Sequence, residues 1–600
     1  MASAFEQWYS IRMQKVAIER RFPTFVDPLI IAFLGALIYF TTSFGQQVLA
    51  PFHATIDIDL SLRSLPEYAF FSMMRGLIAY AISLAFTIVI GYWAAHSKPA
   101  EKILIPFLDI MQSVPVLGFL PGLVLGLVAL FPNNNLGLEL AAIILIFTGQ
   151  VWNMTFSFYS SLKSIPTDMN EASAIIGLSR LQRLKIVELP FSATNLTWNS
   201  IMSMAGGWFF LTVCEAFVLG DRKYRLPGLG AYMAEAIDKG DTRAMTAGII
   251  AMALVIIALD VFLWKPTMAF VHRFRLEEIE GEKPDEPIVD LLLRESYVAN
   301  WLRTWLRARR LGRLLRRGRP QPLLPEAAHT HRLTTLATTF NNVFRAWTLQ
   351  VSLRILRVAL PIAIIGGLLF GLFKLVETLR QVALADWGQI LLYTLYTFMR
   401  VIGALVFSTI WTVPLGIWIS QSQRRLKITQ PIIQLMASFP APMLYPLAAG
   451  LILWLGISFE FGAMALMLLG VQWYVLFNVL AGGLRIPTEL KLASRLMGVS
   501  RTSTWRHLLL PSVFPSLVTG WVTAAGGAWN ASIVAEIMTY KGHTLEARGL
   551  GAMISRAAEK GDFAQLAASL LVMVGVVVIF NRLVWNRLYH AAQTRFRLDL

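Results

Sequence analysis

The sequence predicts an all-α membrane protein with about 12 transmembrane helices, arranged as two parallel six-helix repeats joined by a cytoplasmic linker. Two observations predict this fold. The chain of 600 residues is 56% hydrophobic and only 15% charged, with a mean hydropathy of +0.58, whereas soluble domains carry about 25% charged residues. In addition, a segment of 26 residues occurs twice, 321 positions apart.

The apolar segments set the helix count. A membrane-spanning helix needs roughly 20 mostly apolar residues. Six segments before residue 272 and six after residue 350 meet this requirement. The predicted helices lie near 25–43, 68–95, 103–131, 137–162, 190–220 and 244–271 in the first half, and near 353–375, 387–420, 430–456, 459–482, 511–540 and 564–588 in the second.

The repeated segment reads IPTDMNEASAIIGLSRLQRLKIVELP at 165–190 and IPTELKLASRLMGVSRTSTWRHLLLP at 486–511. Self-similarity at a fixed period indicates a duplicated architecture. Since six is an even number, both halves enter the membrane from the same side, and the repeat is parallel. Further aligned pairs outside this segment are Arg75 with Arg400, Trp208 with Trp529 and Glu215 with Glu536.

Four regions follow from this organisation: a cytoplasmic N-terminal segment at 1–24, a first transmembrane domain at 25–272, a charged linker at 273–345 and a second transmembrane domain at 346–600. The linker begins acidic and then becomes strongly basic. Apolar and Arg residues between 298 and 317 alternate near helical spacing. This pattern predicts an amphipathic helix on anionic membrane lipids; a solvated tether is the alternative.

The distribution of charge predicts the orientation. Lys and Arg gather in alternate loops, as the positive-inside rule requires. Both termini and the repeated segment are therefore expected on the cytoplasmic side. A net charge of +17 could indicate a nucleic-acid partner, but this loop-by-loop clustering argues against one. The single cysteine, Cys214, is expected in the core.

The repeated segment has the features of a docking surface. Each copy begins after a Pro, contains a short helix that ends at Gly177 or Gly498, and finishes at Pro190 or Pro511. Pro suits the first turn of a helix and Gly its end. Packing alone does not require a short surface helix between two membrane spans to have such a similar sequence in both halves. We interpret it as a docking site for a cytosolic partner, and two copies imply two partner subunits.

The segment EASAIIG, followed after nine residues by VELP, resembles the EAA loop of binding-protein-dependent ABC importer permeases. The resemblance implies a type I permease fold and a coupling helix that sits in a groove of a cytosolic ATPase. Leu492 stands where the second loop should have its Glu, which puts the equivalence of the two docking sites in question. The resemblance implies that the residues that couple to the ATPase are Glu171, Ala172, Ser173, Gly177 and Pro190 in the first loop, and Ala493, Ser494, Gly498 and Pro511 in the second.

The SxP motif near the third helix, the intramembrane Glu and the GLG segment resemble the nitrate/sulfonate/taurine branch of these permeases. The resemblance implies two fused permease subunits in a bacterial inner membrane, two cytosolic ABC ATPases and an extracytoplasmic substrate-binding protein. The expected substrate is a small anion such as nitrate, sulfonate, taurine or bicarbonate. A secondary transporter or channel with an internal repeat is the alternative, but it would not need a duplicated cytosolic loop.

The chain is not expected to be an enzyme. It contains no G-x-x-x-x-G-K-[ST] phosphate loop, so ATP and Mg²⁺ are expected to be used by the partner ATPases. It also has no clustered His or Cys residues at metal-ligand spacing. We therefore expect no cofactor, no metal and no catalytic residues in this chain.

Ionisable residues inside a membrane are candidate functional residues. Arg75 and Arg400 lie early in the second helix of each half, and two such cations could attract an anion along the pathway. The alternative is an Arg that extends to the headgroups. Glu215 and Glu536 in the fifth helices are predicted to pair with these arginines, to line the pathway or to anchor the GLG loop. Asp260 is expected to make a hydrogen bond between helices.

Overall fold

The structure, a computed structural model, describes residues 26–53, 56–274, 366–367, 369–540 and 543–595. The chain divides into two compact units. One consists of 36–289 and 382–600, contains both copies of the repeat and carries the sites below; the other consists of 1–35 and 290–381. Three predicted features lie mostly or wholly outside the described residues: the N-terminal segment 1–24, the linker helix within 273–345 and the helix at 353–375.

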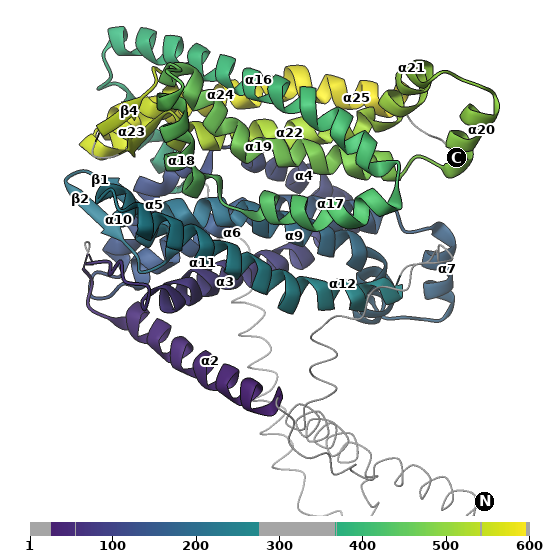
Figure 1. Cartoon of the computed structure of the whole chain (residues 1–600), viewed down its shortest axis with the longest axis horizontal. Coiled ribbons are helices and arrows are strands. Elements are labelled where there is room, and N and C mark those ends of the chain that lie inside the picture. The colour runs from purple at the N-terminus through teal and green to yellow at the C-terminus, as the bar shows by residue number, and fades with distance from the viewer. Residues whose placement is uncertain (1–25, 54–55, 275–365, 368, 541–542, 596–600) are drawn as a thin grey trace, which may run out of the picture. The chain divides into compact units, whose positions relative to one another are not determined.

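The first half is helical apart from one hairpin (Figure 1). Its elements are α2 (Val26–Leu49), α3 (Leu65–His96), α4 (Lys98–Ser113), η1 (Val116–Phe119), α5 (Leu120–Leu130), α6 (Leu136–Lys163), α7 (Thr167–Ile175), α8 (Arg180–Arg183), η2 (Leu184–Glu188), α9 (Leu189–Cys214), β1 (Ala216–Leu219), β2 (Arg222–Arg225), α10 (Leu229–Asp238), α11 (Thr242–Leu259), η3 (Asp260–Trp264), α12 (Lys265–Val271) and η4 (His272–Phe274).

The second half repeats this order from the counterpart of α3 onward. Its elements are α16 (Leu384–Ser420), α17 (Gln423–Ser438), α18 (Ala441–Trp454), α19 (Phe459–Leu484), α20 (Thr488–Leu496), α21 (Arg501–Thr504), η5 (Trp505–Leu509), α22 (Leu510–Ala535), β3 (Ile537–Tyr540), β4 (His543–Glu546), α23 (Leu550–Lys560), α24 (Phe563–Phe580), η6 (Asn581–Trp585) and α25 (Asn586–Arg595). The parallel repeat that the sequence predicts is therefore present in the fold.

Not all of the 12 predicted membrane spans can be checked in the described residues. Eight helices of the described part are long and apolar enough to cross a membrane, or nine if the bent pair of α17 and α18 counts as one span. The helix at 353–375 is not described in full. In the first half, α9 and the α4–α5 pair do not meet the same test. In α9 the polar residues Asn195, Asn199 and Ser203 lower the hydropathy. The two asparagines donate to Ser161 Oγ and Ser157 Oγ of α6 at 2.9 and 2.8 Å.

The third predicted helix of each half is broken, which corrects the continuous helices expected at 103–131 and 430–456. The breaks fall at Val114 and Phe439, whose ψ angles of 128° and 129° are extended. Each is followed by a Pro, and the Pro ring disfavours a helical conformation at the residue before it. α17 and α18 are bent by 89° at this point. The SxP motif is thus a helix break.

The fifth helices end earlier than predicted, at Cys214 and Ala535 rather than at 220 and 540. Antiparallel hairpins follow, β1 with β2 and β3 with β4. The expectation of helix was wrong here because short apolar runs such as AFVL and IMTY suit a strand as well as a helix end. In the first hairpin, Gly220 has φ +58° and provides the turn.

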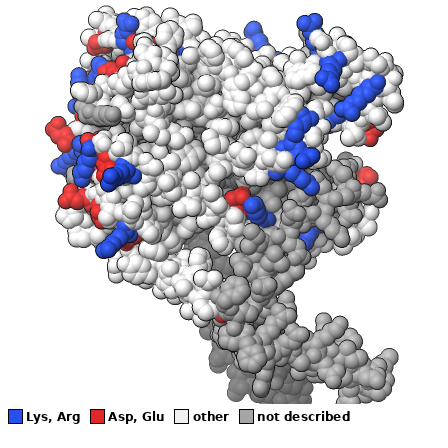
Figure 2. Space-filling view, viewed as in Figure 1, with Lys and Arg blue, Asp and Glu red and all other residues white. Residues whose placement is uncertain are grey.

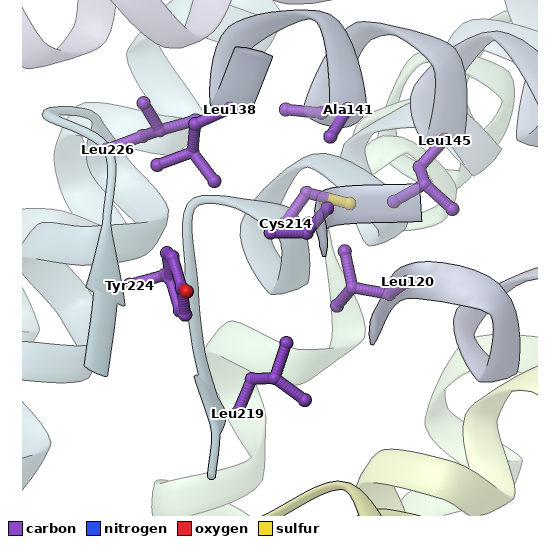
Figure 3. Packing of buried hydrophobic residues seen from close by; sticks show 10 residues of the cluster. Leu120, Leu138, Ala141, Leu145, Cys214, Leu219, Tyr224 and Leu226 are labelled. Atoms are coloured by element: carbon purple, nitrogen blue, oxygen red, sulfur yellow. The ribbon is translucent and has the colours of Figure 1, made fainter. Parts of the chain in front are cut away.

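Three helices form the packed centre of each half. α6 lies between α3 and α9, and α19 lies between α16 and α22. Glycines permit close approach, because a Cβ at Gly91 would meet the Phe158 ring at 2.8 Å. Figure 3 shows the core where α6 meets the end of α9 and the first hairpin, with Cys214 buried among Leu138, Ala141, Leu145 and Tyr224. Cys214 is the core residue that the sequence predicts.

Charged side chains collect at the two ends of the view in Figure 2, and an almost uncharged band separates them. Many large apolar side chains are exposed, including Ile82 at 47%, Val89 at 64% and Ile410 at 63%. Exposed apolar side chains in such number are typical of a membrane or protein contact. Together with the long apolar helices, they mark a multi-pass membrane protein.

Candidate functional site

The first copy of the repeated segment forms a short helix and a sharp turn. α7 follows Pro166 and ends at Gly177, whose φ of +73° lies in the left-handed region that favours glycine. Ser179 then caps α8: its Oγ accepts from the Gln182 backbone N–H at 3.4 Å, and Gln182 Oε1 accepts from the Ser179 N–H at 2.9 Å. The turn at Gly177 and the cap at Ser179 thus direct the chain from α7 back into the bundle.

The second copy reproduces this geometry. α20 follows Pro487 and ends at Gly498, where φ is +67°. Ser500 Oγ accepts from the Ser503 backbone N–H at 3.2 Å and caps α21. Both loops then pass through a π-helical turn into α9 and α22. The helix ends that the sequence predicts at the two glycines are confirmed.

We call these two segments, 165–190 and 486–511, the coupling loops. They lie at the same end of the bundle, opposite the two hairpins (Figure 1). Both expose apolar side chains beside Gly177 and Gly498: Ile175 is 86% exposed, Ile176 73%, Leu496 79% and Met497 80%. Such side chains on short polar helices mark a contact surface.

The predicted coupling residues occupy different environments in the two loops. Glu171, Ala172 and Gly177 are exposed, whereas Ser173 is buried and its Oγ donates to the Asn170 carbonyl at 2.7 Å. In the second loop Leu492 and Gly498 are exposed, Ala493 and Ser494 are half-buried, and Pro190 and Pro511 are half-buried at the starts of α9 and α22.

Different side-chain contacts hold the two coupling loops in place. In the first, Arg183 pairs with Glu188 at 2.9 Å and donates to Asn170 Oδ1 at 2.9 Å, and His96 Nε2 also contacts Glu188 at 2.9 Å. In the second loop, the position of Arg183 is taken by Thr504, whose hydroxyl bonds to Ser494 at 2.9 Å. The contacts of Arg183 in the first loop are therefore replaced in the second by a hydroxyl–hydroxyl hydrogen bond.

Lys491 occupies the position of Asn170 in the second loop. Its ammonium donates to the Gly483 carbonyl at 3.5 Å. Partial burial, and then the nearby Arg495, lower the pKa of Lys491 below its ordinary value. The two coupling loops thus differ in charge as well as in the contacts that hold them.

A buried ion network lies at the hairpin end of the first half. Arg75 on α3 is fully buried. Its Nε and Nη2 donate to both carboxylate oxygens of Glu139 at 2.7 Å, and its Nη1 donates to Glu215 at 2.7 Å and to the Pro227 carbonyl at 2.8 Å. Two-point pairing of this kind is among the strongest hydrogen-bonded ion pairs.

Glu215 extends the network to the GLG segment. It accepts from Ser72 Oγ at 2.7 Å and from the Gly230 N–H at 2.7 Å, while Ser72 Oγ accepts from the Leu229 N–H at 2.8 Å. A Cβ at Gly228 would overlap the Glu215 carboxylate. The network therefore joins α3, α6, the end of α9 and the start of α10.

The second half has a similar network, but Arg400 reaches the Glu460 carboxylate through one nitrogen only, because its Nε donates to the Glu460 backbone carbonyl at 2.9 Å. Arg400 donates to Glu536 at 2.8 Å and pairs with Glu460, and Glu536 accepts from Thr397 Oγ1 at 2.7 Å and the Gly551 N–H at 2.8 Å. Glu139 is 1% exposed, but its counterpart Glu460 is 33% exposed and is shared with Arg548. The second network is more open to solvent.

The structure therefore shows two of the three roles considered for the glutamates: pairing with the arginines and anchoring of the GLG segment. Four of the five N–H donors of Arg75 are bonded within the protein. The role of Arg75, Arg400, Glu215 and Glu536 in a pathway stays a prediction, and none of the four lines the cavity described next. Glu139 and Glu460 were missed by sequence reasoning.

A central cavity of about 120 Å³ lies between the two halves. Its walls come from α6 and α9 of the first half and from α19, α22 and α24 of the second. No Lys, Arg, Asp or Glu is among the described residues that line it. The polar lining residues are Gln112, Thr148, Asn153, Ser203, Tyr474, Thr523, Asn530 and Asn581.

The two halves also contact each other directly. Asn530 Oδ1 accepts from the Val116 N–H at 2.8 Å, just after the helix break of the first half. Gln434 Nε2 donates to Asp260 at 2.8 Å, which confirms Asp260 as a helix–helix hydrogen-bond partner. At the hairpin end, the Gly220 N–H donates to the Ala558 carbonyl at 3.1 Å.

Replacement of Glu139 by Gln is expected to destabilise the protein more than replacement of Glu460 by Gln. Glu139→Gln leaves the buried charge of Arg75 with one carboxylate, and loss of a partner from a buried pair costs about 3–5 kcal/mol. Glu460 is partly solvated, so its loss should cost less. Thermal unfolding of the two purified variants measures the difference; equal melting temperatures would contradict it.

Gly228→Ala and Gly549→Ala are expected to lower the melting temperature, because the new methyl group would displace the carboxylate of Glu215 or Glu536. Gly126→Ala is the matched control, since a Cβ there would meet no atom within 4 Å. The control should melt like the unmodified chain. Unchanged melting of both GLG variants would show that the close approach is not required.

Among curated sequences, the chain is similar to the taurine transport system permease protein TauC of Escherichia coli (28% identical over 180 residues, 30% of this chain and 60% of TauC). It is also similar to the nitrate import permease protein NrtB of Leptolyngbya laminosa (26% over 191 residues, 31% and 63%) and to the glycine betaine/proline betaine permease protein ProW of E. coli (25% over 219 residues, 36% and 58%). The chain thus spans about 60% of the length of these relatives.

Among solved structures, an inward-facing form of the MetNI methionine ABC transporter matches with a TM-score of 0.31 and 18% identity, over 35% of this chain and 99% of that one. The sequence profile of the binding-protein-dependent transport system inner membrane component matches residues 87–263 and again residues 412–598. These two ranges contain both coupling loops and most of the cavity lining. The chain belongs to this family of ABC importer permeases and contains the family domain twice, as two permease domains fused in one polypeptide.

Proposed function

We propose that the chain is the translocation subunit of an ATP-driven importer in a bacterial inner membrane. Two cytosolic ATPase subunits dock on the coupling loops, and an extracytoplasmic binding protein delivers a small solute at the hairpin end. The observation that supports this most directly is the duplication of the coupling-loop geometry with exposed apolar residues at the same end of the bundle. ATP and Mg²⁺ are used by the ATPases, and this chain binds no cofactor.

The packing provides a route from the docking surface to the cavity. Met169 on α7 packs on a cluster that includes Phe158 and Leu162 of α6 and Leu196 of α9. These two helices also wall the central cavity. A movement of α7 would therefore shift the cavity wall as a packed unit. ATP-bound ATPases can shift the equilibrium between two conformations of the chain only as far as they bind one conformation more tightly than the other. The helices α7 and α20 would transmit that difference to the bundle.

The charge distribution supports the proposed orientation. At the end that carries α20 and α21, the visible charges are mainly Lys and Arg, whereas the hairpin end mixes both signs (Figure 2). Basic residues are enriched in cytoplasmic loops. The coupling-loop end would therefore face the cytoplasm, together with both termini.

The proposed substrate is a small solute with an oxyanion group, such as nitrate, a sulfonate, taurine or bicarbonate. Relatives named as taurine, nitrate and aliphatic sulfonate permeases support this class. The relative named as a glycine betaine/proline betaine permease is compatible with it, since a betaine also has a carboxylate.

Ile176→Asp and Met497→Asp together are expected to abolish ATPase association. A charge on each exposed apolar contact adds a desolvation cost at both interfaces without disturbing the core, because these side chains are 73% and 80% exposed. The amount of ATPase that co-purifies with the full chain, and its stimulated ATP hydrolysis, measure the effect. Each single variant should retain one ATPase subunit.

Leu62→Asp serves as the matched control, because Leu62 is an equally exposed apolar residue, at 71%, just before α3. It should retain both ATPase subunits. If the double variant also retained both and transported normally, the coupling loops would not be the docking sites.

A further inference from the structure

A second pocket, of about 270 Å³, lies at the seam between the two halves. Its walls come from α9, α11, η3 and α12 of the first half and from α17 of the second. Most of its lining side chains are apolar, and three of them, Ile257, Pro431 and Ile432, are exposed. We call this pocket the seam groove. Because exposed apolar side chains line it, it opens onto the apolar surface where a membrane protein meets lipid.

The charged side chains of the seam groove pair with each other. Asp260 Oδ1 accepts from Gln434 Nε2 at 2.8 Å, and Asp260 Oδ2 lies 3.5 Å from Lys265 Nζ. The described lining of the groove therefore carries no net charge, which suits an apolar occupant. An apolar cavity of about 150 Å³ can hold a benzene molecule, so the groove has room for several methylene groups.

One face of α17 connects the seam groove with a group of cations. Arg424, Ile428, Ile432 and Leu435 follow one another at intervals of four, four and three residues, so they lie on one side of the helix. Ile432 and Leu435 line the groove, whereas Arg424 is exposed in the first turn of α17. At 1.5 Å per residue, Arg424 and Leu435 are roughly 16 Å apart along the helix. This is about half of the 30 Å hydrocarbon core, and thus about the depth that one acyl chain fills.

The cations begin where the apolar surface of α16 ends. Ile410 and Trp418 are exposed on α16, and Trp side chains are enriched at the boundary between membrane and water. The guanidinium carbon of Arg425 lies 4.3 Å from the centre of the Trp418 ring, which is a cation–π contact. The positive charges of Arg424, Arg425 and Lys427 therefore lie at the level of the lipid headgroups.

These cations have no carboxylate partner in the part of the chain that the structure describes. None of Arg424, Arg425 and Lys427 forms an ion pair with a described residue. The corresponding residues of the first half are Pro99, Ala100 and Lys102. Beside Lys102, Glu101 supplies a negative charge and pairs with Lys163 at 2.8 Å. The first half thus keeps one of the three cations next to a carboxylate, and the full cluster occurs in the second half.

We propose that the seam groove and the cations at the start of α17 form a binding site for one anionic phospholipid. The phosphate group lies between Arg424 and Lys427, and one acyl chain follows α17 into the groove. The positive cluster selects an anionic headgroup, and the apolar groove holds the chain. The bound lipid contacts both halves, because both contribute walls to the groove. Such a site requires only that the chain is embedded in a membrane, so it does not depend on the proposed function.

The test uses the purified full chain in phosphatidylcholine nanodiscs that contain a small share of a phosphatidylglycerol probe. The probe carries a photoreactive diazirine at the end of one acyl chain, and mass spectrometry identifies the labelled peptides after illumination. Labelling is expected in the segments around Ile257 and Leu435, which line the groove. Unlabelled phosphatidylglycerol should displace the probe in a saturable manner, whereas the same share of phosphatidylethanolamine, which has no net charge, should not.

Combined replacement Arg424→Gln and Lys427→Gln should lower the labelling of the groove about 25-fold. At a low share of probe the labelling is proportional to affinity, and each surface cation contributes about 1 kcal/mol, or about fivefold. Both side chains are exposed, so the melting temperature should not change. The charge-preserving pair Arg424→Lys and Lys427→Arg should keep the labelling, and Lys102→Gln is the matched control in the first half and should also leave it unchanged.

Three outcomes would overturn the proposal. Equal displacement by phosphatidylethanolamine would show that the groove does not select an anionic headgroup. Equal labelling of α4 in the first half, or unchanged labelling of the double Gln variant, would show only general contact with lipid. Loss of the groove labelling when an ATPase binds would assign the cations to the ATPase contact instead of to a lipid.

Discussion

The buried pairing of one arginine with two glutamates is the interaction on which each half of the protein depends. Arg75 and Glu215 come from helices that are 140 positions apart in the chain, and Glu139 joins them from a third. In an apolar environment each charge alone would be very costly, so the three groups require one another. Because Glu215 also binds the backbone of the GLG segment, the same ion network determines where α9 ends and where α10 begins. The hairpin between them is positioned as a consequence.

The coupling loops lie at the opposite end of the same helices. α6 and α9 extend from the ion network, past the central cavity, to the cluster that holds α7. Under the proposed function, α7 is a docking surface, and the ion network at the opposite end would hold these helices while a displacement of α7 shifts the cavity wall. The second half has the same plan, but its anchor is partly solvated at Glu460, and a hydroxyl–hydroxyl hydrogen bond replaces the contacts that Arg183 makes in the first loop. The fused chain therefore allows the two coupling loops to differ, as two copies of a single subunit could not.

Much of this plan could be predicted from the sequence. The 321-residue shift, the parallel repeat, the ends of the coupling helices at Gly177 and Gly498, and the pairing of Arg75 with Glu215 all follow from patterns within one chain. Glu139 was missed although it falls in the first turn of the helix predicted at 137–162 and the same shift aligns it with Glu460, because an acidic residue is common in the first turn of a helix. The hairpins were missed because four apolar residues after a long helix suit either structure. The cavity could not be predicted, since contacts such as Val116 with Asn530 join residues 414 positions apart and depend on how the two halves pack.

Under the proposed function, the two coupling loops approach each other when the docked ATPases bind ATP. The distance between spin labels at positions 176 and 497, measured by pulsed electron resonance on the complex of the full chain with its ATPases in nanodiscs, tests this most directly. A shift of the distance distribution to shorter values on addition of ATP, which reverses after hydrolysis, is the predicted result. A distribution that stays the same with and without ATP, in a complex that still hydrolyses ATP and transports, would contradict the account.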